Sequence, residues 1–205
     1  MAKPLVGILM GSDSDLPVMQ EAVAMLREFG IEYEVTIASA HRTPKKALEY
    51  AQSAERRGLK ALIAGAGWAA HLAGIIASQT TLPVIGVPID SSALKGIDAL
   101  LSTVQMPGGV PVATMSLGKA GAKNAGIFAA QIIGTHDVKI ANRLKVYKVE
   151  MEREVEEKAK KIAFVAAPQE TAAPAAAEAG PELKKKPRRR RRKKKPGAAP
   201  GQEHA

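Results

Sequence analysis

The sequence predicts an α/β fold in which a five-stranded parallel sheet lies between two layers of helices. Short apolar runs of strand length alternate with longer segments of helical periodicity over about the first 135 residues. This alternation is typical of parallel strands joined by helical crossovers, which cover both faces of a sheet. With 46% apolar residues, the 205-residue chain can bury a core of that size. Five strands in this length favour a flavodoxin-like, three-layer sandwich.

The first four elements follow from local patterns. An apolar run bounded by glycine predicts a strand at Pro4–Met10, and apolar residues on one face predict a helix over Leu16–Phe29. Strict alternation over Ile31–Ile37 predicts a strand with one more polar face, near an edge of the sheet. Proline in the first turn and Gly58 after the end predict a helix over Pro44–Arg57.

The next six elements complete the sheet and its cover of helices. Ala61–Ala64 is expected to be a buried strand, and His71–Gln79 a short helix. Apolar runs predict the last two strands at Pro83–Val87 and Pro111–Met115, with a helical stretch between them. The apolar, alanine-rich segment Ala120–Gly134 is expected to be a helix on the sheet.

An extra long helix is expected over Lys139–Phe164, with one narrow apolar stripe and other faces dense in Lys and Glu. We favour packing of this stripe against another subunit, and a helix folded back on its own domain is the alternative. The stripe consists of Ile140, Leu144, Tyr147, Met151, Val155 and Ile162.

The net charge of +10 is concentrated in a C-terminal tail. Residues 166–205 contain 11 Lys and Arg against 4 Glu, a net charge of +7, which leaves +3 for residues 1–165. Leu183 is the single large apolar residue of the tail, so we expect a folded domain over 1–165 and a disordered segment over 166–205. The basic run Lys184–Lys195 either binds a polyanion such as nucleic acid or only solubilises the chain. Its lack of interleaved aromatic residues favours the second function.

The composition excludes several classes of protein. Without cysteine, the chain has no disulfide, no thiolate nucleophile and no cysteine-ligated metal. No run of 18 apolar residues occurs, so no membrane span is expected. The apolar run near the N-terminus is too short for a signal peptide, and a cytoplasmic location is expected.

Site residues are expected in the turns after the strands, because ligands of doubly wound sheets lie beyond the carboxyl ends of the strands. After the first strand, Gly11 permits a tight turn, and Ser12 and Ser14 offer hydroxyls to a phosphate at a helix N-terminus. The charges of Asp13 and Asp15 repel an anion. One of these carboxylates is therefore expected to cap the helix or to accept hydrogen bonds from sugar hydroxyls.

The second and third turns each contribute a histidine. Arg42 offers a fork of donors for phosphate oxygens, and His41 is a candidate general acid and base because imidazole titrates near neutrality. The small residues of the third turn allow the backbone to approach a flat ligand. The site residues expected from these turns are Ser39, His41, Arg42, Gly65, Gly67, Ala70 and His71.

Familiar nucleotide and metal motifs are absent from the sequence. It has no GxxxxGK[ST], no GxGxxG after the first strand, no HExxH and no GxSxG. No metal or cofactor is therefore expected. The chemistry is left to histidine, hydroxyls and backbone dipoles, which limits it to proton transfer and electrostatic stabilisation of a reactive substrate.

Five segments together resemble a known family, and their order and spacing extend over about residues 1–160. They are Gly11–Asp15, Ser39–Pro44, Ala64–Gly67 with Ala69–Leu72, Gln105–Pro107, and Gly118–Ala122 with Asn124–Ala125. They are similar to the N5-carboxyaminoimidazole ribonucleotide mutases, the catalytic subunits of bacterial phosphoribosylaminoimidazole carboxylase in purine (IMP) biosynthesis. The resemblance implies a flavodoxin-like fold and a homo-octamer with sites near subunit interfaces, an assembly that the long C-terminal helix suits.

The resemblance also implies a reaction that needs no ATP, biotin or metal. The carboxylate of the substrate moves from the exocyclic amine to ring carbon 4 by decarboxylation and recarboxylation, with His41 as general acid and base. The implied substrate contacts are Ser12, Asp15 and Arg42 at the ribose phosphate, and His71 with residues 65–70 around the imidazole and CO2.

Two positions depart from the family pattern. Trp68 stands where the family usually has glycine, and Ala73 stands where it usually has proline. The ring of Trp68 either shields the pocket or faces outward at a subunit contact, and the sequence leaves both open. Two other functions remain as alternatives: direct carboxylation of aminoimidazole ribonucleotide by CO2, which the segment Gln105–Thr114 disfavours, and polyanion binding through the tail.

Overall fold

Five parallel strands form the sheet of the structure, a computed structural model that describes residues 3–165. The strand order is β2-β1-β3-β4-β5, so the predicted parallel sheet and the place of the second strand at its edge are confirmed. The strands are β1 (Val6–Met10), β2 (Tyr33–Ile37), β3 (Ala61–Gly67), β4 (Val84–Ile89) and β5 (Ala113–Thr114).

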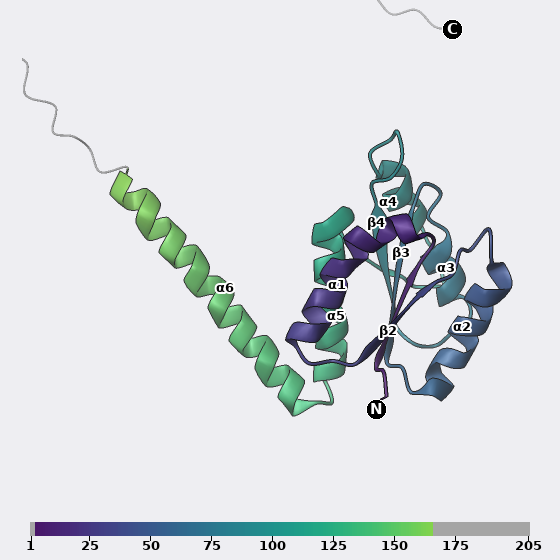
Figure 1. Ribbon diagram of the computed structural model, residues 1–205, viewed down its shortest axis with the longest axis horizontal. Helices are drawn as coiled ribbons and strands as arrows, with labels where there is room; N and C mark the ends of the chain where they lie inside the picture. The colour runs from purple at the N-terminus through teal and green to yellow at the C-terminus, as the bar shows by residue number, and fades with distance from the viewer. Residues whose placement is uncertain (1–2, 166–205) are drawn as a thin grey trace, which may run out of the picture. The chain divides into compact units, whose positions relative to one another are not determined.

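Helices cover both faces of this sheet, which confirms the predicted three-layer sandwich (Figure 1). Helices α1 (Leu16–Glu28) and α5 (Gly118–Gly134) pack on one face. Helices α2 (Pro44–Arg57) and α3 (Leu72–Ala77) pack on the other face, together with α4 (Ile97–Val104).

Both faces of the central strands are buried because successive side chains point to opposite sides. In β1, Ile8 and Met10 point toward α1 and α5, whereas Leu9 points toward α2 and α3. All three side chains are at most 1% exposed. The apolar run that predicted a strand therefore belongs to two separate layers of the core.

Glycine permits a very close approach between α1 and α5. A Cβ atom built on Gly126 of α5 would lie 2.8 Å from the carbonyl oxygen of Ala22 and 2.9 Å from the Cβ of Met25. The backbone of α5 therefore lies directly on the surface of α1. This contact holds α1 firmly at the position from which its N-terminal end reaches the site described below.

The first turns of the long helix α6 (Val138–Val165) pack on the same domain. Asp137 caps its start, where its Oδ1 accepts a hydrogen bond of 2.8 Å from the backbone N–H of Lys139. Ile140 is buried, and the ring of Tyr147 meets that of Phe29 edge to face at 5.5 Å between centroids. A helix that folds back on its own domain, the alternative weighed above, describes this first part of α6.

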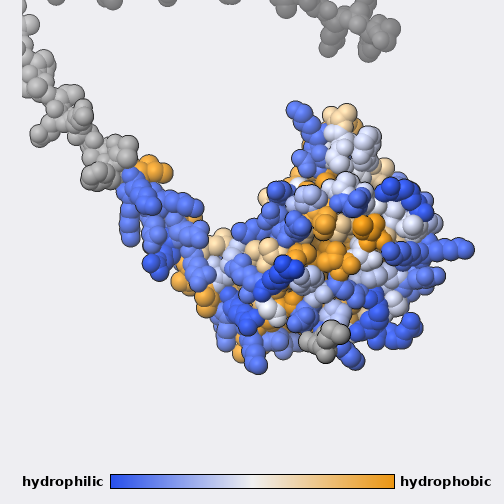
Figure 2. Space-filling model, in the orientation of Figure 1, coloured by the Kyte–Doolittle hydropathy of each residue, from blue (hydrophilic) through white to orange (hydrophobic). Residues whose placement is uncertain are grey.

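The second part of α6 has no such cover within the chain. Every side chain from Lys148 to Ile162 is exposed, including Val155 at 66% and Ile162 at 69%. Figure 2 shows hydrophobic residues among hydrophilic ones along this helix. These apolar side chains continue the predicted stripe, and their contact with another subunit stays a prediction.

The compact unit that contains the sheet extends to Ile162. The boundary expected at 165/166 stays a prediction. The basic run at 184–195 and the disorder predicted for 166–205 lie outside the described residues. Within residues 3–165, no helix has both the length and the apolar character that crossing a membrane requires.

Candidate active site

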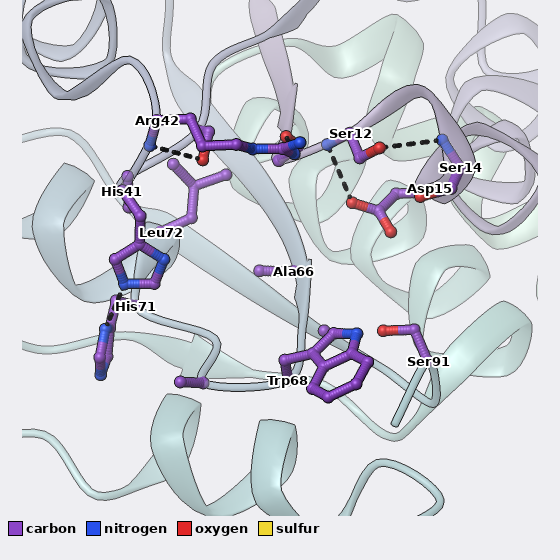
Figure 3. Close-up of a pocket in the computed structure, with 15 residues that line it drawn as sticks. Ser12, Ser14, Asp15, His41, Arg42, Ala66, Trp68, His71, Leu72 and Ser91 are labelled. Carbon is purple, nitrogen blue, oxygen red and sulfur yellow. Dashed lines mark hydrogen bonds between the residues drawn. The ribbon is translucent and has the colours of Figure 1, made fainter. Parts of the chain in front are cut away.

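A cavity of about 450 Å³ opens beyond the carboxyl ends of β1, β2, β3 and β4 (Figure 3). Each of these strands contributes the turn that follows it, as expected for a doubly wound sheet. The lining residues are Gly11, Ser12, Ser14, Asp15, Ser39, Ala40, His41, Arg42, Ala66, Gly67, Trp68, Ala69, His71, Leu72 and Ser91. The structure thus brings together nine of the eleven predicted site residues.

The turn after β1 forms a short 3-10 helix over Asp13–Asp15 that leads into α1. Ser12 and Asp15 cap it reciprocally: the Ser12 hydroxyl accepts from the Ser14 N–H, and Asp15 accepts from the Ser12 N–H at 3.2 Å. Capping, one of the two expected uses of these carboxylates, therefore applies to Asp15. The Ser14 hydroxyl lies on an exposed residue at the cavity wall.

Asp15 is 7% exposed, and its environment disfavours ionisation. Burial raises the pKa of this carboxyl above the ordinary 3.8, against hydrogen bonds from the Ser12 and Gly11 backbone and the positive charge of Arg42, which lower it. The nearby charge of Asp13 acts in the same direction as burial. The Asp15 carboxyl thus lies in the cavity wall, where it caps a turn and interacts electrostatically with Arg42.

The turn after β2 is held rigid by its own hydroxyls. The Thr43 hydroxyl accepts from the Ser39 N–H at 2.9 Å, and the Ser39 hydroxyl accepts from the Arg42 N–H at 3.1 Å. These bonds project the Arg42 side chain across the turn after β1, where its Nη2 donates to the carbonyl oxygen of Gly11 at 2.7 Å. The remaining guanidinium donors face the cavity beside Ser12 (Figure 3).

The two histidines meet in a direct contact that joins two turns. His41 Nε2 lies 2.7 Å from His71 Nδ1, and the rings are nearly perpendicular with centroids 4.9 Å apart. One ring must carry the proton of this bond and the other the lone pair. Both rings are exposed to the cavity. When both rings are neutral, one of the two ring nitrogens outside this bond is an N–H donor and the other is an acceptor, and both can meet a bound ligand.

Strand β3 continues through Gly67, beyond its predicted end at Ala64, so Gly65 belongs to the strand and not to the turn in which it was expected. Gly65 pairs with Val87 in the sheet, and a side chain there would collide with Met19 of the core. Gly65 and Ala70 do not line the cavity. Gly65 lies within the sheet, where the absence of a side chain makes room for Met19 of α1, and its contact with a substrate stays a prediction.

Gly67 and Trp68 form the cavity wall at the end of β3. A side chain on Gly67 would collide with the hydroxyl of Ser91, so glycine allows the turn after β4 to approach. Trp68 follows with a positive φ of 54° and is 65% exposed. Its side chain lines the cavity, and a contact with another subunit at this residue stays a prediction.

Ser91 lies in a turn after a predicted strand, where site residues were expected, but sequence reasoning did not single it out as one of them. Lys46 was missed as well: it lines a hollow of about 410 Å³ that shares Gly11, Ser12 and Arg42 with the main cavity. The signal for Lys46 was its place in the first turn of α2, directly after the Arg42 turn. Within residues 3–165, no three His, Asp or Glu side chains gather into a set suited to a metal ion.

The fold and the cavity together define a doubly wound α/β protein with a small-molecule site. One end of the site offers a guanidinium and helix-start N–H groups to an anion. The other end offers an imidazole pair that can move a proton. Backbone and hydroxyl groups hold both ends in place.

Comparison with known proteins identifies the family. A family model described as AIR carboxylase matches residues 5–154, so the chain belongs to this family, and the resemblance drawn from its motifs is confirmed. A relative from Pyrococcus horikoshii, named N5-carboxyaminoimidazole ribonucleotide mutase, is 61% identical over 160 residues, which are 78% of this chain and 89% of the relative. A Thermotoga maritima relative of the same name is 60% identical over 159 residues, with 78% and 92% covered.

Solved structures agree with the sequence comparison. The crystal structure of Treponema denticola PurE matches with a TM-score of 0.70 at 32% identity, and the match covers 77% of this chain and 98% of that one. The likeness extends over the sheet and its helices, which supports a shared architecture for the site.

Proposed function

We propose that this protein is an N5-carboxyaminoimidazole ribonucleotide mutase, an isomerase of purine biosynthesis. One observation carries the proposal: the His41–His71 pair shares a cavity with Arg42 and the Ser12–Asp15 turn. A proton-transferring pair and an anion-binding end are what a carboxylate shift on a phosphorylated imidazole needs. The names of the relatives described above support the same activity.

The phosphate end of the substrate would lie at Arg42 and the Ser12–Asp15 turn. One N–H group of the Arg42 guanidinium donates to the carbonyl oxygen of Gly11, and its other N–H groups are available to phosphate oxygens. The Asp15 carboxyl lies beside that position, where it accepts a hydrogen bond from the Ser12 N–H at 3.2 Å. A ribose hydroxyl can donate to Asp15, which gives the turn a contact with the sugar as well as with the phosphate.

The reaction then divides into two steps at the imidazole end. First, the bond between the exocyclic nitrogen and its carboxylate breaks, CO2 leaves without the electron pair, and the nitrogen takes a proton from His41. Second, ring carbon 4 attacks the carbon of CO2, and His41 removes the proton from carbon 4 to restore the aromatic ring. His41 ends in the protonation state in which it began.

His71 orients the acid–base residue during these steps. Because its Nδ1 lies 2.7 Å from His41 Nε2, it fixes the ring of His41 and responds when that ring gains or loses a proton. Walls formed by Ala66, Ala69 and Leu72 are apolar, and they keep CO2 close to ring carbon 4.

Turnover with two substrates tests the assignment. We expect purified protein to isomerise N5-carboxyaminoimidazole ribonucleotide, and product formation only from aminoimidazole ribonucleotide with CO2 would establish the direct carboxylase instead. His41→Asn should retain substrate binding and lose turnover by about 10³-fold or more, because it removes the group that donates and accepts the proton. Near wild-type turnover of this variant would remove His41 from its role.

We also propose a homo-octamer, in which the exposed second part of α6 packs against neighbouring subunits. Its support is the row of exposed apolar side chains at Met151, Val155 and Ile162. Light scattering of wild-type protein and of Val155→Lys should give a smaller assembly for the variant. Glu156→Lys, which changes an exposed charged neighbour, is the control.

A cytoplasmic location completes the proposal, since phosphorylated intermediates do not cross membranes and are used where they are made; cell fractionation tests it. Contact of residues 184–195 with a polyanion stays a prediction. Titration with RNA before and after removal of residues 166–205 tests that contact, and the mutase proposal expects catalysis to be unchanged by the truncation.

A further inference from the structure

Trp68 adopts a backbone conformation that large side chains rarely take. Its φ is 54°, and among residues 3–165 only Lys95 is another non-glycine residue with positive φ. The left-handed region brings Cβ close to the carbonyl oxygen and strains an L-residue. Such strain persists where the surroundings fix it, and it is concentrated at ligand sites.

Packing within the chain does not account for this strained tryptophan. Its side chain is 65% exposed, whereas the neighbouring Ala70 and Leu72 are 2% exposed. An exposed indole contributes little to the stability of the domain. The side chain nevertheless lies on the wall of the cavity that contains His41 and Arg42.

The place of the indole in the cavity is defined by two neighbouring turns. Glycine at position 67 lets the Ser91 turn approach the end of β3, and the indole lies beside Ser91. Figure 3 shows it on the side of the cavity away from Arg42, with Ala66 between them. The polar, phosphate-binding end and the indole therefore belong to different ends of one site.

Trp68 is the one large, accessible apolar surface among the cavity-lining residues, because Leu72 is buried. A flat heterocycle has a π face that stacks on an aromatic ring, whereas a sugar phosphate has none. The end of the cavity opposite Arg42 therefore favours a ligand with a planar ring.

We propose that Trp68 is a specificity-determining residue whose indole forms the wall on which the heterocycle of the bound nucleotide stacks. The identity of that heterocycle, an aminoimidazole, rests on the proposed function. The stacking itself requires only a ring attached to the phosphate-bearing ribose. Trp68 thus discriminates between a nucleotide and a bare sugar phosphate that fits the same Arg42 end.

The single tryptophan of the chain makes the test direct. Wild-type protein is titrated with aminoimidazole ribonucleotide and with ribose 5-phosphate, and the tryptophan emission and calorimetric Kd are recorded. Trp68→Gly and Trp68→Phe are titrated by calorimetry with the same two ligands. Glycine accepts the positive φ without strain, and phenylalanine keeps an aromatic face, so the pair separates loss of the ring from a change in the backbone.

We expect Trp68→Gly to weaken the nucleotide Kd by about 10-fold or more, which corresponds to about 1.4 kcal/mol. Its Kd for ribose 5-phosphate should stay within about twofold of wild type. Trp68→Phe should keep most of the nucleotide affinity, and only the nucleotide should shift the emission of the wild type strongly.

Three results would overturn the inference: an unchanged nucleotide Kd in Trp68→Gly, an equal loss for both ligands, or a smaller assembly of this variant by light scattering. The last would make Trp68 a subunit contact. Failure of the proposed function looks different, because wild-type protein would then bind the nucleotide through Trp68 and yet show no turnover.

Discussion

Replacement of Gly126 by alanine probes the contact between α1 and α5. The new Cβ atom would lie 2.8 Å from the Ala22 carbonyl oxygen, 2.9 Å from the Met25 Cβ and 3.2 Å from the Ala22 Cα. Ordinary contacts begin near 3.4 Å, so the two helices must separate by about 0.6 Å at this point. Main-chain atoms cannot rotate away as a side-chain tip can, and the whole of α1 must therefore move.

Two opposing effects set the change in the free energy of unfolding that Gly126→Ala causes. Overpacking in a well-packed core costs about 1–3 kcal/mol, and we take the upper part of this range because two of the three contacts are with main-chain atoms. Alanine in place of glycine in a helix returns up to about 1 kcal/mol. The free energy of unfolding should therefore fall by about 1–2 kcal/mol.

Urea unfolding followed by circular dichroism, at one protein concentration for all variants, measures this difference. Gly108→Ala is the matched control, because no atom lies within 4 Å of its Cβ position. The control should change the free energy of unfolding by less than about 0.5 kcal/mol. A Gly126→Ala protein as stable as the wild type, or more stable, would show that α1 and α5 do not pack this closely.

Three further changes test the site and its surroundings. Arg42→Ala should raise KM by about 10- to 100-fold with little change in kcat, since a hydrogen bond to a charged group is worth about 1.5–3 kcal/mol. Initial-rate measurements give both constants, and a loss confined to kcat would contradict a phosphate contact. Because burial raises the pKa of Asp15 in the folded state, its contribution to stability falls as pH rises above 3.8. Asp15→Asn should gain stability relative to wild type between pH 4 and pH 7 in urea unfolding, and a difference independent of pH would refute the raised pKa. Tyr50→Phe removes a 2.6 Å hydrogen bond to Glu34 and should lower the unfolding free energy by about 1–2 kcal/mol, with an unchanged KM as the sign that it acts on stability alone.

Local signals predicted the helices well and the strand ends less well. Helix α2 begins at Pro44 and ends at Arg57 as predicted, since proline favours a first turn and Gly58 takes a left-handed φ of 98°. The end of β3 was wrong because small residues there resemble a turn. Their pairing with β4 is a tertiary contact that the local sequence does not contain.

The site was predictable where topology alone determines it. Parallel strands place the turns that contain Ser12, His41 and His71 at one edge of the sheet. The direct contact between the two imidazoles could not be predicted, because β1 lies between the strands that lead to them. The side-chain position of Trp68 depends on its positive φ, which the residue type does not reveal. The family pattern gave no guide to this side chain, because the family usually has glycine at this position.

All residues that line the cavity lie between Gly11 and Ser91, although the sheet is completed only by residues 113–114 and covered by α5. A ribosome therefore completes the segment that lines the cavity before it has made α5, the helix that packs on β1 and α1. Domains generally fold as units during synthesis, so the nascent chain has every cavity-lining residue before it has a surface able to hold them in place. The last third of the described chain must therefore be synthesised before the sheet around the cavity can be buried, although it contributes none of the lining residues.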